Sequence, residues 1–414
     1  MNIAQWLVRA SRAFPNHVAV AHGIAPHATY RELAERAAAL AHYFRSTLRC
    51  ESGERIGLAM PNCPAYLEVL AGIWWAGLAA VPINPGLDAK EVSAILDHAG
   101  ASCCFTGPAD AAASIALIGE HRTIDVTSAR YRALVQSGQA APITWCGPDD
   151  VAWLFYTGGG TVPPKGVMLS HRNLLAMTLC YMADVDAVRA ADCVIHAAPL
   201  SQGSGLYGLP HMAAAATQVV PEGGMFDPDE IFVLARQWHG ATMLATRTMG
   251  KRMIDHVKSL QPALEPIKTI TFSAGSMQPG DCAEALATLG PRIVKVYGPA
   301  ECPMAVTALS KFHLADSTHP RFSAHLRSIG VPQSAVEVRV VDALDHVLPP
   351  GAKGEIIVRG DPVMRGYWMN PRATAATLKG GWLHTGDIGA FDEDGFLTLA
   401  DEGDVRIVVG SRED

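Results

Sequence analysis

Residues 153–171 read WLFYTGGGTVPPKGVMLSH, and the rest of the chain is organised around them. The stretch begins as an apolar run typical of a buried strand, breaks into three glycines, two prolines and a lysine, and resumes as a second apolar run. This pattern predicts a hairpin with a polar tip. Glycines let backbone N–H groups approach an anion, hydroxyls add donors, and a lysine adds positive charge. The tip is therefore suited to holding phosphate.

This loop is not the phosphate-binding loop of the kinase-like NTPases. That loop needs a Ser or Thr directly after its lysine and a helix beyond it. Here Gly166 follows Lys165, and the next residues predict a strand. Taken alone, the stretch could also be a solvated Gly/Pro turn with an incidental lysine.

The bulk composition limits the classes of protein to consider. The chain has 414 residues, 49% of them hydrophobic, which is enough for a large core and two or three subdomains. Its net charge of −7 does not favour a nucleic-acid partner. Nine cysteines without paired spacing predict free thiols in a reducing cytoplasm. Residues 1–14 predict an amphipathic docking helix rather than a signal peptide, and the apolar segment 69–81 is shorter than the roughly 20 residues of a membrane span.

The order of predicted elements indicates an α/β fold. Strands alternate with helices between residues 29 and 106 and again between 173 and 273, which predicts βαβ units and mostly parallel sheets. From Ser328 the pattern changes to short alternating strands, typical of a β-barrel. We therefore expect two α/β subdomains in residues 1–327, a β-barrel-like subdomain in 328–400, and a short remnant in 401–414.

The hairpin sequence resembles the signature loop of the adenylate-forming (ANL) superfamily, which includes acyl-CoA and aryl-CoA ligases, luciferases and the adenylation domains of peptide synthetases. The family pattern YTSGTTGxPKGV followed by SH is matched at Tyr156-Thr157, Gly159, Thr161, Pro164-Lys165-Gly166-Val167 and Ser170-His171. It is not matched at Gly158, Gly160 and Val162, so two hydroxyl donors are missing. The resemblance implies the family's large N-terminal domain. It also implies that residues 401–414 are a hinge remnant, with Glu402 at the hinge arginine position and the small C-terminal lid absent.

Two further segments resemble family motifs. Residues 297–301, YGPAE, resemble YGxTE, with Ala300 in place of the threonine, and residues 385–387 resemble the family's TGD. The run from Gly354 to Thr374 resembles a signature with a mostly structural role. By this resemblance, the catalytic residues are Lys165, Thr161 and Glu301, with Thr161 and Glu301 holding Mg²⁺. The implied ATP site comprises Thr157, Gly158, Gly159, Gly160, Thr161 and Lys165 at the phosphates, Ala274, Gly275, Ser276, Tyr297, Gly298, Pro299, Ala300 and Glu301 around adenine and the α-phosphate, and Asp387 at the ribose.

The resemblance also implies an acyl pocket. Gln202 stands where the ligases usually carry a histidine, and a loop residue bound by backbone is the alternative interpretation of this glutamine. The pocket would be formed by Gln202, Gly203, Ala274, Gly275 and Met304. The isolated His196, His211 and His239 are predicted to be structural or exposed, and His171, which lies in the signature, has no evident role as a base.

The predicted function is an ATP-dependent carboxylic acid:CoA ligase that uses ATP, Mg²⁺ and CoA, and whose partner is a small-molecule carboxylic acid. Two alternatives remain open. One is an adenylation domain that loads a carrier protein. The other is a degenerate pseudoenzyme that binds a nucleotide or acyl ligand, which the missing hydroxyls favour and the retained Lys165, Glu301 and Asp387 oppose. A homodimer is also open.

Overall fold

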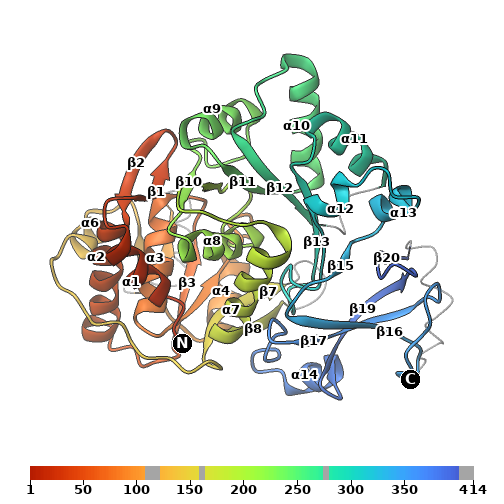
Figure 1. Cartoon of the computed structure of the whole chain (residues 1–414). Helices are drawn as coiled ribbons and strands as arrows, with labels where there is room; N and C mark the ends of the chain where they lie inside the picture. The colour runs from red at the N-terminus through yellow and green to blue at the C-terminus, as the bar shows by residue number, and fades with distance from the viewer. Residues whose placement is uncertain (108–121, 158–163, 274–278, 401–414) are drawn as a thin grey trace.

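The computed structural model describes residues 1–107, 122–157, 164–273 and 279–400. In these ranges the strands form three sheets (Figure 1). The first has the order β6-β5-β3-β4-β7-β8, and every neighbouring pair is parallel except β7 and β8. Its strands are β3 (Arg55–Ala59), β4 (Ala79–Pro82), β5 (Ala101–Thr106), β6 (Thr123–Asp125), β7 (Val151–Thr157) and β8 (Lys165–Ser170).

The second sheet is also mostly parallel. Its order is β15-β14-β13-β12-β11-β9-β10-β1-β2, so an N-terminal hairpin completes a sheet built mainly from later residues. Its strands are β1 (Val18–His22), β2 (Ala25–Thr29), β9 (Cys193–Ile195), β10 (Thr217–Val220), β11 (Ala241–Ala245), β12 (Ile267–Ser273), β13 (Ile293–Tyr297), β14 (Thr307–Leu309) and β15 (Val331–Pro332).

The third sheet is antiparallel, with the order β16-β17-β19-β18 and β20 paired to β19. Its strands are β16 (Val336–Val341), β17 (Gly354–Gly360), β18 (Leu378–Lys379), β19 (Trp382–Phe391) and β20 (Leu397–Leu399). The α/β fold class is confirmed. The third sheet begins at Val336, because β15 still pairs with β14. The subdomain boundaries at 327 and 400 remain predictions.

Helices pack around the sheets (Figure 1). Several begin at local caps visible in the sequence. Thr29 and Glu32 form a capping box at the start of α2, as the pattern predicts. The α-helices in the described ranges are α1 (Gln5–Ala13), α2 (Tyr30–His42), α3 (Pro64–Trp75), α4 (Ala89–Ala99), α6 (Ala129–Val135), α7 (His171–Cys180), α8 (Gly203–Ala213), α9 (Pro228–Trp238), α10 (Arg247–Leu260), α11 (Pro279–Leu289), α12 (Lys311–Ala315), α13 (Phe322–Arg327) and α14 (Pro371–Thr377), and π-helical turns η1 (Tyr43–Thr47) and η3 (Tyr181–Val185) continue α2 and α7.

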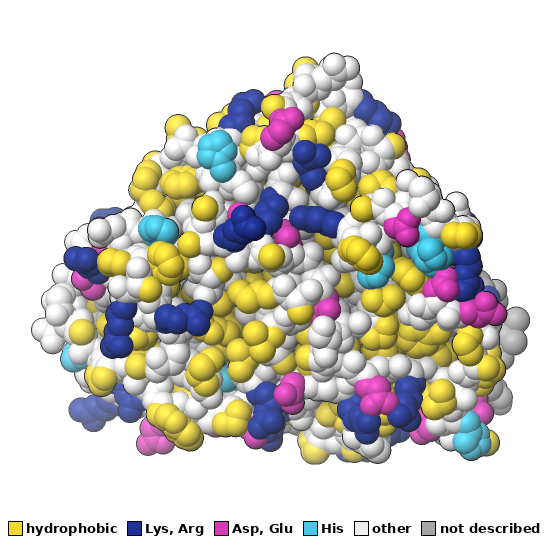
Figure 2. All heavy atoms as spheres, in the orientation of Figure 1, with side chains coloured by type: hydrophobic (Ala, Val, Ile, Leu, Met, Phe, Trp, Pro, Cys, Tyr) yellow, Lys and Arg dark blue, Asp and Glu magenta, His cyan; other side chains and the backbone are white. Residues whose placement is uncertain are grey.

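The N-terminus docks as predicted. The Asn2 side chain donates to the carbonyls of Trp74 (2.6 Å) and Thr144 (3.0 Å), and the Ile3 N–H donates to Nδ1 of His171 (3.2 Å). The helix α1 then buries Trp6, Leu7 and Ala10. No helix within the described ranges is both long and apolar enough to cross a membrane. On the face shown in Figure 2, lysine and arginine side chains are scattered among acidic, histidine and apolar ones.

The third sheet is fastened to the hairpin β7–β8. The N–H of Met168 donates to the Gly366 carbonyl (2.9 Å), and the N–H of Trp368 donates to the Gly166 carbonyl (2.7 Å). Tyr367 lies between Gly366 and Trp368, on the segment that joins β17 to α14. It is therefore held against β8, where it forms a β-bridge with Val167. This junction brings Lys165 close to residues about 200 positions later in the chain.

Candidate functional site

A cavity of about 600 Å³ lies where the end of β13 meets the third sheet. It is lined by Pro299 and Glu301 after β13, by Tyr367, and by residues of β17, α14 and β19. Its volume falls in the range of small-molecule sites. Of the predicted nucleotide residues, Pro299 and Glu301 line this cavity, and so do Gly386 and Ile388 on either side of Asp387.

The turn after β13 is tightly folded. A Cβ on Gly298 would lie 2.3 Å from the Cys302 carbonyl oxygen and 2.7 Å from the Met304 nitrogen, so only glycine fits without moving the backbone. The chain then returns to β13, where the Val306 N–H donates to the Tyr297 carbonyl (3.0 Å). This turn places Glu301 at the cavity wall and the Met304 side chain next to Gly203.

Glu301 is held from two sides. Its backbone carbonyl accepts from the Met364 N–H (2.7 Å), and its carboxylate accepts from the Tyr367 hydroxyl (2.5 Å). The Lys165 ammonium lies 5.0 Å from the centre of the Tyr367 ring. Burial, followed by the bond to Glu301, raises the pKa of Tyr367 to about 12, so the hydroxyl stays protonated and donates at neutral pH. Tyr367 thus connects the predicted phosphate lysine with the predicted metal carboxylate.

Tyr297 and Asp387 form a second pair. The Tyr297 hydroxyl donates to Oδ2 of Asp387 (2.5 Å), and burial is the main cause that raises the pKa of Tyr297. Asp387 is exposed, and its N–H donates to the Thr385 hydroxyl (3.1 Å). Glu355 on β17 accepts from the Gly386 N–H (3.1 Å) and contacts Nδ1 of His384 (2.9 Å). These bonds hold the backbone at residues 386 and 387, so the Asp387 carboxylate is fixed next to Gly386, which lines the cavity.

The predicted acyl residues lie on the other side of the turn. A Cβ on Gly203 would lie 2.6 Å from Cδ2 of Leu244 and 3.1 Å from Sδ of Met304, so Gly203 and Met304 are close neighbours. Met304 is half-buried with a positive φ of 55°. Gln202 is exposed and precedes α8 without capping it through its side chain. The backbone of Met304 lies against Gly298, so the predicted acyl-pocket residues Gly203 and Met304 adjoin the predicted nucleotide-binding residues of the turn.

Several predicted site residues fall outside the described ranges. These are Gly158, Gly159, Gly160, Thr161, Ala274, Gly275, Ser276 and the hinge remnant 401–414. For Thr157 the structure describes only the backbone, which pairs with Lys165 at the base of the hairpin. The roles of all these residues remain predictions.

Sequence reasoning missed four residues around the cavity. Tyr367 was expected to be structural, and Glu355, His384 and Thr385 were not assigned to the site. Tyr367 lies in the run from 354 to 374 that resembles a family signature. The other indication in the sequence was the polar pair His384-Thr385 directly before Gly386-Asp387. Neither segment indicates which distant carboxylate it contacts.

The isolated histidines are structural or exposed, as predicted. His196 contacts the Ser204 hydroxyl (2.9 Å) and Oε1 of Gln218 (3.2 Å), and His211 contacts the Tyr207 carbonyl and the Thr242 hydroxyl. His239 is exposed. Burial lowers the pKa of His196 to about 3 and those of His171 and His211 to about 4. All three imidazoles are therefore uncharged near neutral pH.

These histidines predict a loss of stability in mild acid. Their folded pKa values lie below the ordinary value of about 6.5, so the unfolded state takes up protons first as the pH falls. The free energy of unfolding is therefore little affected by these histidines above about pH 6.5, and it falls as the pH drops from there toward 4. At pH 5 we expect a loss of roughly 1–2 kcal/mol per histidine in the free energy of unfolding. Urea unfolding at pH 7.5 and 5.0 measures it.

The variant His196→Gln should unfold at lower urea at pH 7.5 but show a shallower dependence on pH, because one titrating group is gone. The exposed His346 offers the control, since His346→Gln should leave that dependence as it is in the parent. Equal slopes for the parent and His196→Gln would contradict the assignment.

Comparisons with known proteins identify the family and the fold of this chain. The family described as AMP-binding enzyme matches residues 7–368. A feruloyl-CoA synthase from Amycolatopsis sp. is 32% identical over 410 residues, which span 99% of this chain and 80% of that protein. A medium/long-chain-fatty-acid–CoA ligase, FadD8 of Mycobacterium tuberculosis, is 29% identical, with 92% of this chain and 67% of that protein covered. The solved N-terminal domain of FACL13 from M. tuberculosis has a TM-score of 0.86 at 22% identity, covering 97% of this chain and 100% of that one. Its likeness concerns the fold.

Proposed function

The chain belongs to the AMP-binding enzyme family, and on that premise we propose that it is an ATP-dependent carboxylic acid:CoA ligase. The observation that carries the proposal is the arrangement Lys165–Tyr367–Glu301, in which Tyr367 and Glu301 line the cavity, together with the pair Tyr297–Asp387, whose neighbour Gly386 lines the same cavity. Lys165 would supply a positive charge for the phosphates, and Glu301 a carboxylate that can bind a metal ion. Asp387 would supply an exposed carboxylate that can accept hydrogen bonds from the ribose hydroxyls.

The reaction proceeds in two displacements. An oxygen of the substrate carboxylate attacks the α-phosphorus of ATP, the bond from that phosphorus to the bridging oxygen breaks, and pyrophosphate leaves. The CoA thiolate then attacks the acyl carbonyl carbon, and AMP leaves with the electrons of the acyl–oxygen bond. In the first step Lys165 would stabilise negative charge on the phosphates, and Asp387 would orient the ribose.

The residues present fit a hard divalent cation. The Glu301 carboxylate is an oxygen ligand of the kind that Mg²⁺ prefers, and the Tyr367 hydroxyl orients it. Glu301 would hold the ion together with Thr161 and phosphate oxygens. When bound, Mg²⁺ would neutralise charge on the phosphates during transfer.

The acid is proposed to be an aromatic or medium-length acyl acid. Support comes from the adaptable Met304 beside Gly203, and from the relatives named for feruloyl and fatty-acid substrates. Gln202 would supply hydrogen bonds without a titrating ring at the pocket entrance.

The proposal is tested by calorimetric titration with AMP and ATP·Mg²⁺, combined with ATP–pyrophosphate exchange in the presence of ferulate, benzoate and octanoate. Acid-dependent exchange and a CoA thioester by mass spectrometry are expected. Nucleotide binding without exchange for any acid would instead favour the ligand-binding pseudoenzyme, and no nucleotide binding would exclude the ligase.

The variant Asp387→Ala is expected to weaken AMP binding by about 10- to 100-fold, because a carboxylate that accepts hydrogen bonds contributes roughly 1.5–3 kcal/mol. Calorimetry with AMP avoids any dependence on the chemical steps. The exposed Asp361, which lies outside the cavity, offers the same change as a control, and Asp361→Ala should bind AMP as the parent does. An unaltered affinity for Asp387→Ala would remove Asp387 from the ribose site.

A further inference from the structure

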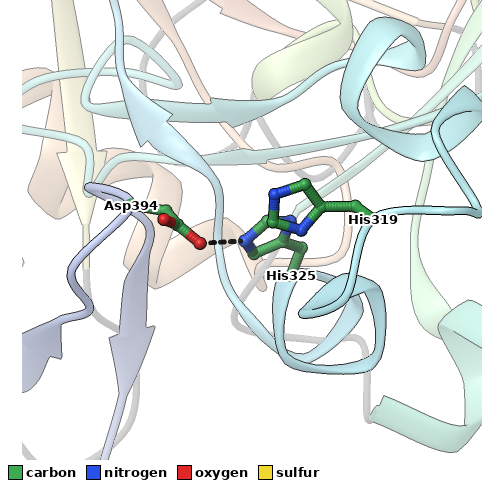
Figure 3. Close-up of side chains that lie close together, drawn as sticks. All are labelled: His319, His325 and Asp394. Carbon is green, nitrogen blue, oxygen red and sulfur yellow. Dashed lines mark hydrogen bonds and ion pairs between the residues drawn. The ribbon is translucent and has the colours of Figure 1, made fainter.

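A second polar cluster lies away from the nucleotide cavity. His319 follows α12, His325 lies in α13, and Asp394 lies in the turn between β19 and β20 (Figure 3). One potential ligand atom from each residue lies within 4.8 Å of the other two. Figure 2 shows histidine and acidic side chains gathered over this part of the surface, near α13 and β20. The nucleotide site uses none of the three.

We propose that His319, His325 and Asp394 form a binding site for a divalent transition-metal ion of the Zn²⁺ type. Two imidazoles and a carboxylate are the donor set that such ions prefer, and a water would complete a four-coordinate site. Mg²⁺, which binds oxygen ligands, would not be held by two imidazoles. The site is thus distinct in chemistry from the Mg²⁺ position at Glu301.

The spacing suits this ion. Around a tetrahedral Zn²⁺ with bonds of about 2.0–2.2 Å, neighbouring ligand atoms lie about 3.3–3.5 Å apart. Nε2 of His325 and Oδ2 of Asp394 are already 3.2 Å apart (Figure 3). His319 is half-buried, and its potential ligand atom lies within 4.8 Å of those of His325 and Asp394. Its Nδ1 accepts from the Arg321 N–H (3.2 Å), and coordination would end that bond.

His325 is held firmly in place. It is buried, and its ring stacks on Phe396 with centroids 3.7 Å apart and an interplanar angle of 10°. The His319 ring lies on its other side, with centroids 4.6 Å apart. The hydroxyl of Ser328 donates to the His325 backbone carbonyl (2.7 Å). A ligand fixed in this way costs little conformational entropy on binding.

The carboxylates around the cluster favour a cation, but the Arg321 guanidinium would compete with it for Asp394. Glu393 and Asp394 pair with the guanidinium of Arg321, and Oδ2 of Asp392 lies 4.0 Å from Nε2 of His325, so three carboxylates and one guanidinium lie at this cluster. Nε of Arg321 contacts Oδ2 of Asp394 at 2.7 Å, so Arg321 occupies the oxygen that also faces His325 and that the metal needs. Removing Arg321 should strengthen metal binding.

Metal binding at this site would cross-link parts of the chain that are distant in sequence. The turn with Asp394 joins β19 to β20, and β19 carries Asp387. The two histidines lie on the connection between β14 and β15 of the second sheet. A bound ion would therefore link the hairpin that presents Asp387 to the second sheet.

The test is calorimetric titration of tag-free, EDTA-treated full chain with ZnCl₂ in excess Mg²⁺, with Co²⁺ absorption to report the coordination geometry. One site is expected, with a raised Tm on Zn²⁺ addition. His319→Ala should weaken binding at least tenfold, and Arg321→Ala should tighten it several-fold. His346→Ala, which removes an exposed histidine paired with Asp342, is the matched control and should bind as the parent does.

Three outcomes would overturn the proposal. The first is equal Zn²⁺ affinity for the parent and His319→Ala. The second is weaker binding by Arg321→Ala, and the third is full displacement of Zn²⁺ by millimolar Mg²⁺. His319 is used rather than His325 because His319 is less buried, so its replacement spares the stack on Phe396. The Tm of each metal-free variant verifies that it is folded.

Discussion

Glu301→Gln is expected to slow acyl-adenylate formation by at least about 100-fold, because glutamine keeps the shape of the side chain but loses the charge that would bind Mg²⁺. The Tyr367 hydroxyl would still find an acceptor, so the turn after β13 should stay folded. The effect should therefore fall on the chemical step and on the dependence upon Mg²⁺. Initial rates of ATP–pyrophosphate exchange over a range of Mg²⁺ concentrations measure both quantities.

A matched change at Glu337 separates this effect from a general loss of charge. Glu337 lies on β16 and pairs with Arg339 and Arg359, away from the cavity-lining residues. Glu337→Gln should leave exchange within about twofold of the parent, as surface substitutions usually do. If Glu301→Gln kept the parent's rate and its Mg²⁺ dependence, Glu301 could not be the metal ligand.

Gly298→Ala is expected to lower the free energy of unfolding by about 2–3 kcal/mol, because the added methyl group overpacks a tightly folded turn. The atoms that it would meet are backbone atoms of Cys302, Met304 and Ala305, at 2.3, 2.7 and 3.0 Å, and they cannot rotate away. Any folded protein should also bind nucleotide more weakly, because the displaced turn carries Glu301. Urea unfolding at pH 7.5 measures the first effect, and AMP titration the second.

Gly280 provides the control for this substitution. It lies in α11, and a Cβ there would meet no atom within 4 Å. Gly280→Ala should be neutral or stabilising by up to about 1 kcal/mol, because alanine favours helix. Equal urea midpoints for Gly298→Ala and the parent would show that the turn can relax, and the argument from its close contacts would be wrong.

Much of the fold could be predicted because its signals are local. The capping box of Thr29 and Glu32 acts over three residues, and the hairpin β7–β8 follows from two apolar runs around glycines and prolines. The change to short alternating strands indicated the third sheet. The exact pairing of strands was not available from such patterns. Nothing near β1 in the sequence shows that it pairs with β10, about 200 residues later.

The candidate site residues Lys165, Glu301 and Asp387 could be picked out from the sequence alone through the motifs around them, and their roles remain predictions. Tertiary structure alone decided which residues meet. Tyr367 contacts Glu301 across 66 positions, Tyr297 contacts Asp387 across 90, and His325 contacts Asp394 across 69. The physical reason is one of range. Caps, turns and periodicity act within a few residues, whereas these contacts depend on how the third sheet packs against β8, the turn after β13 and α13.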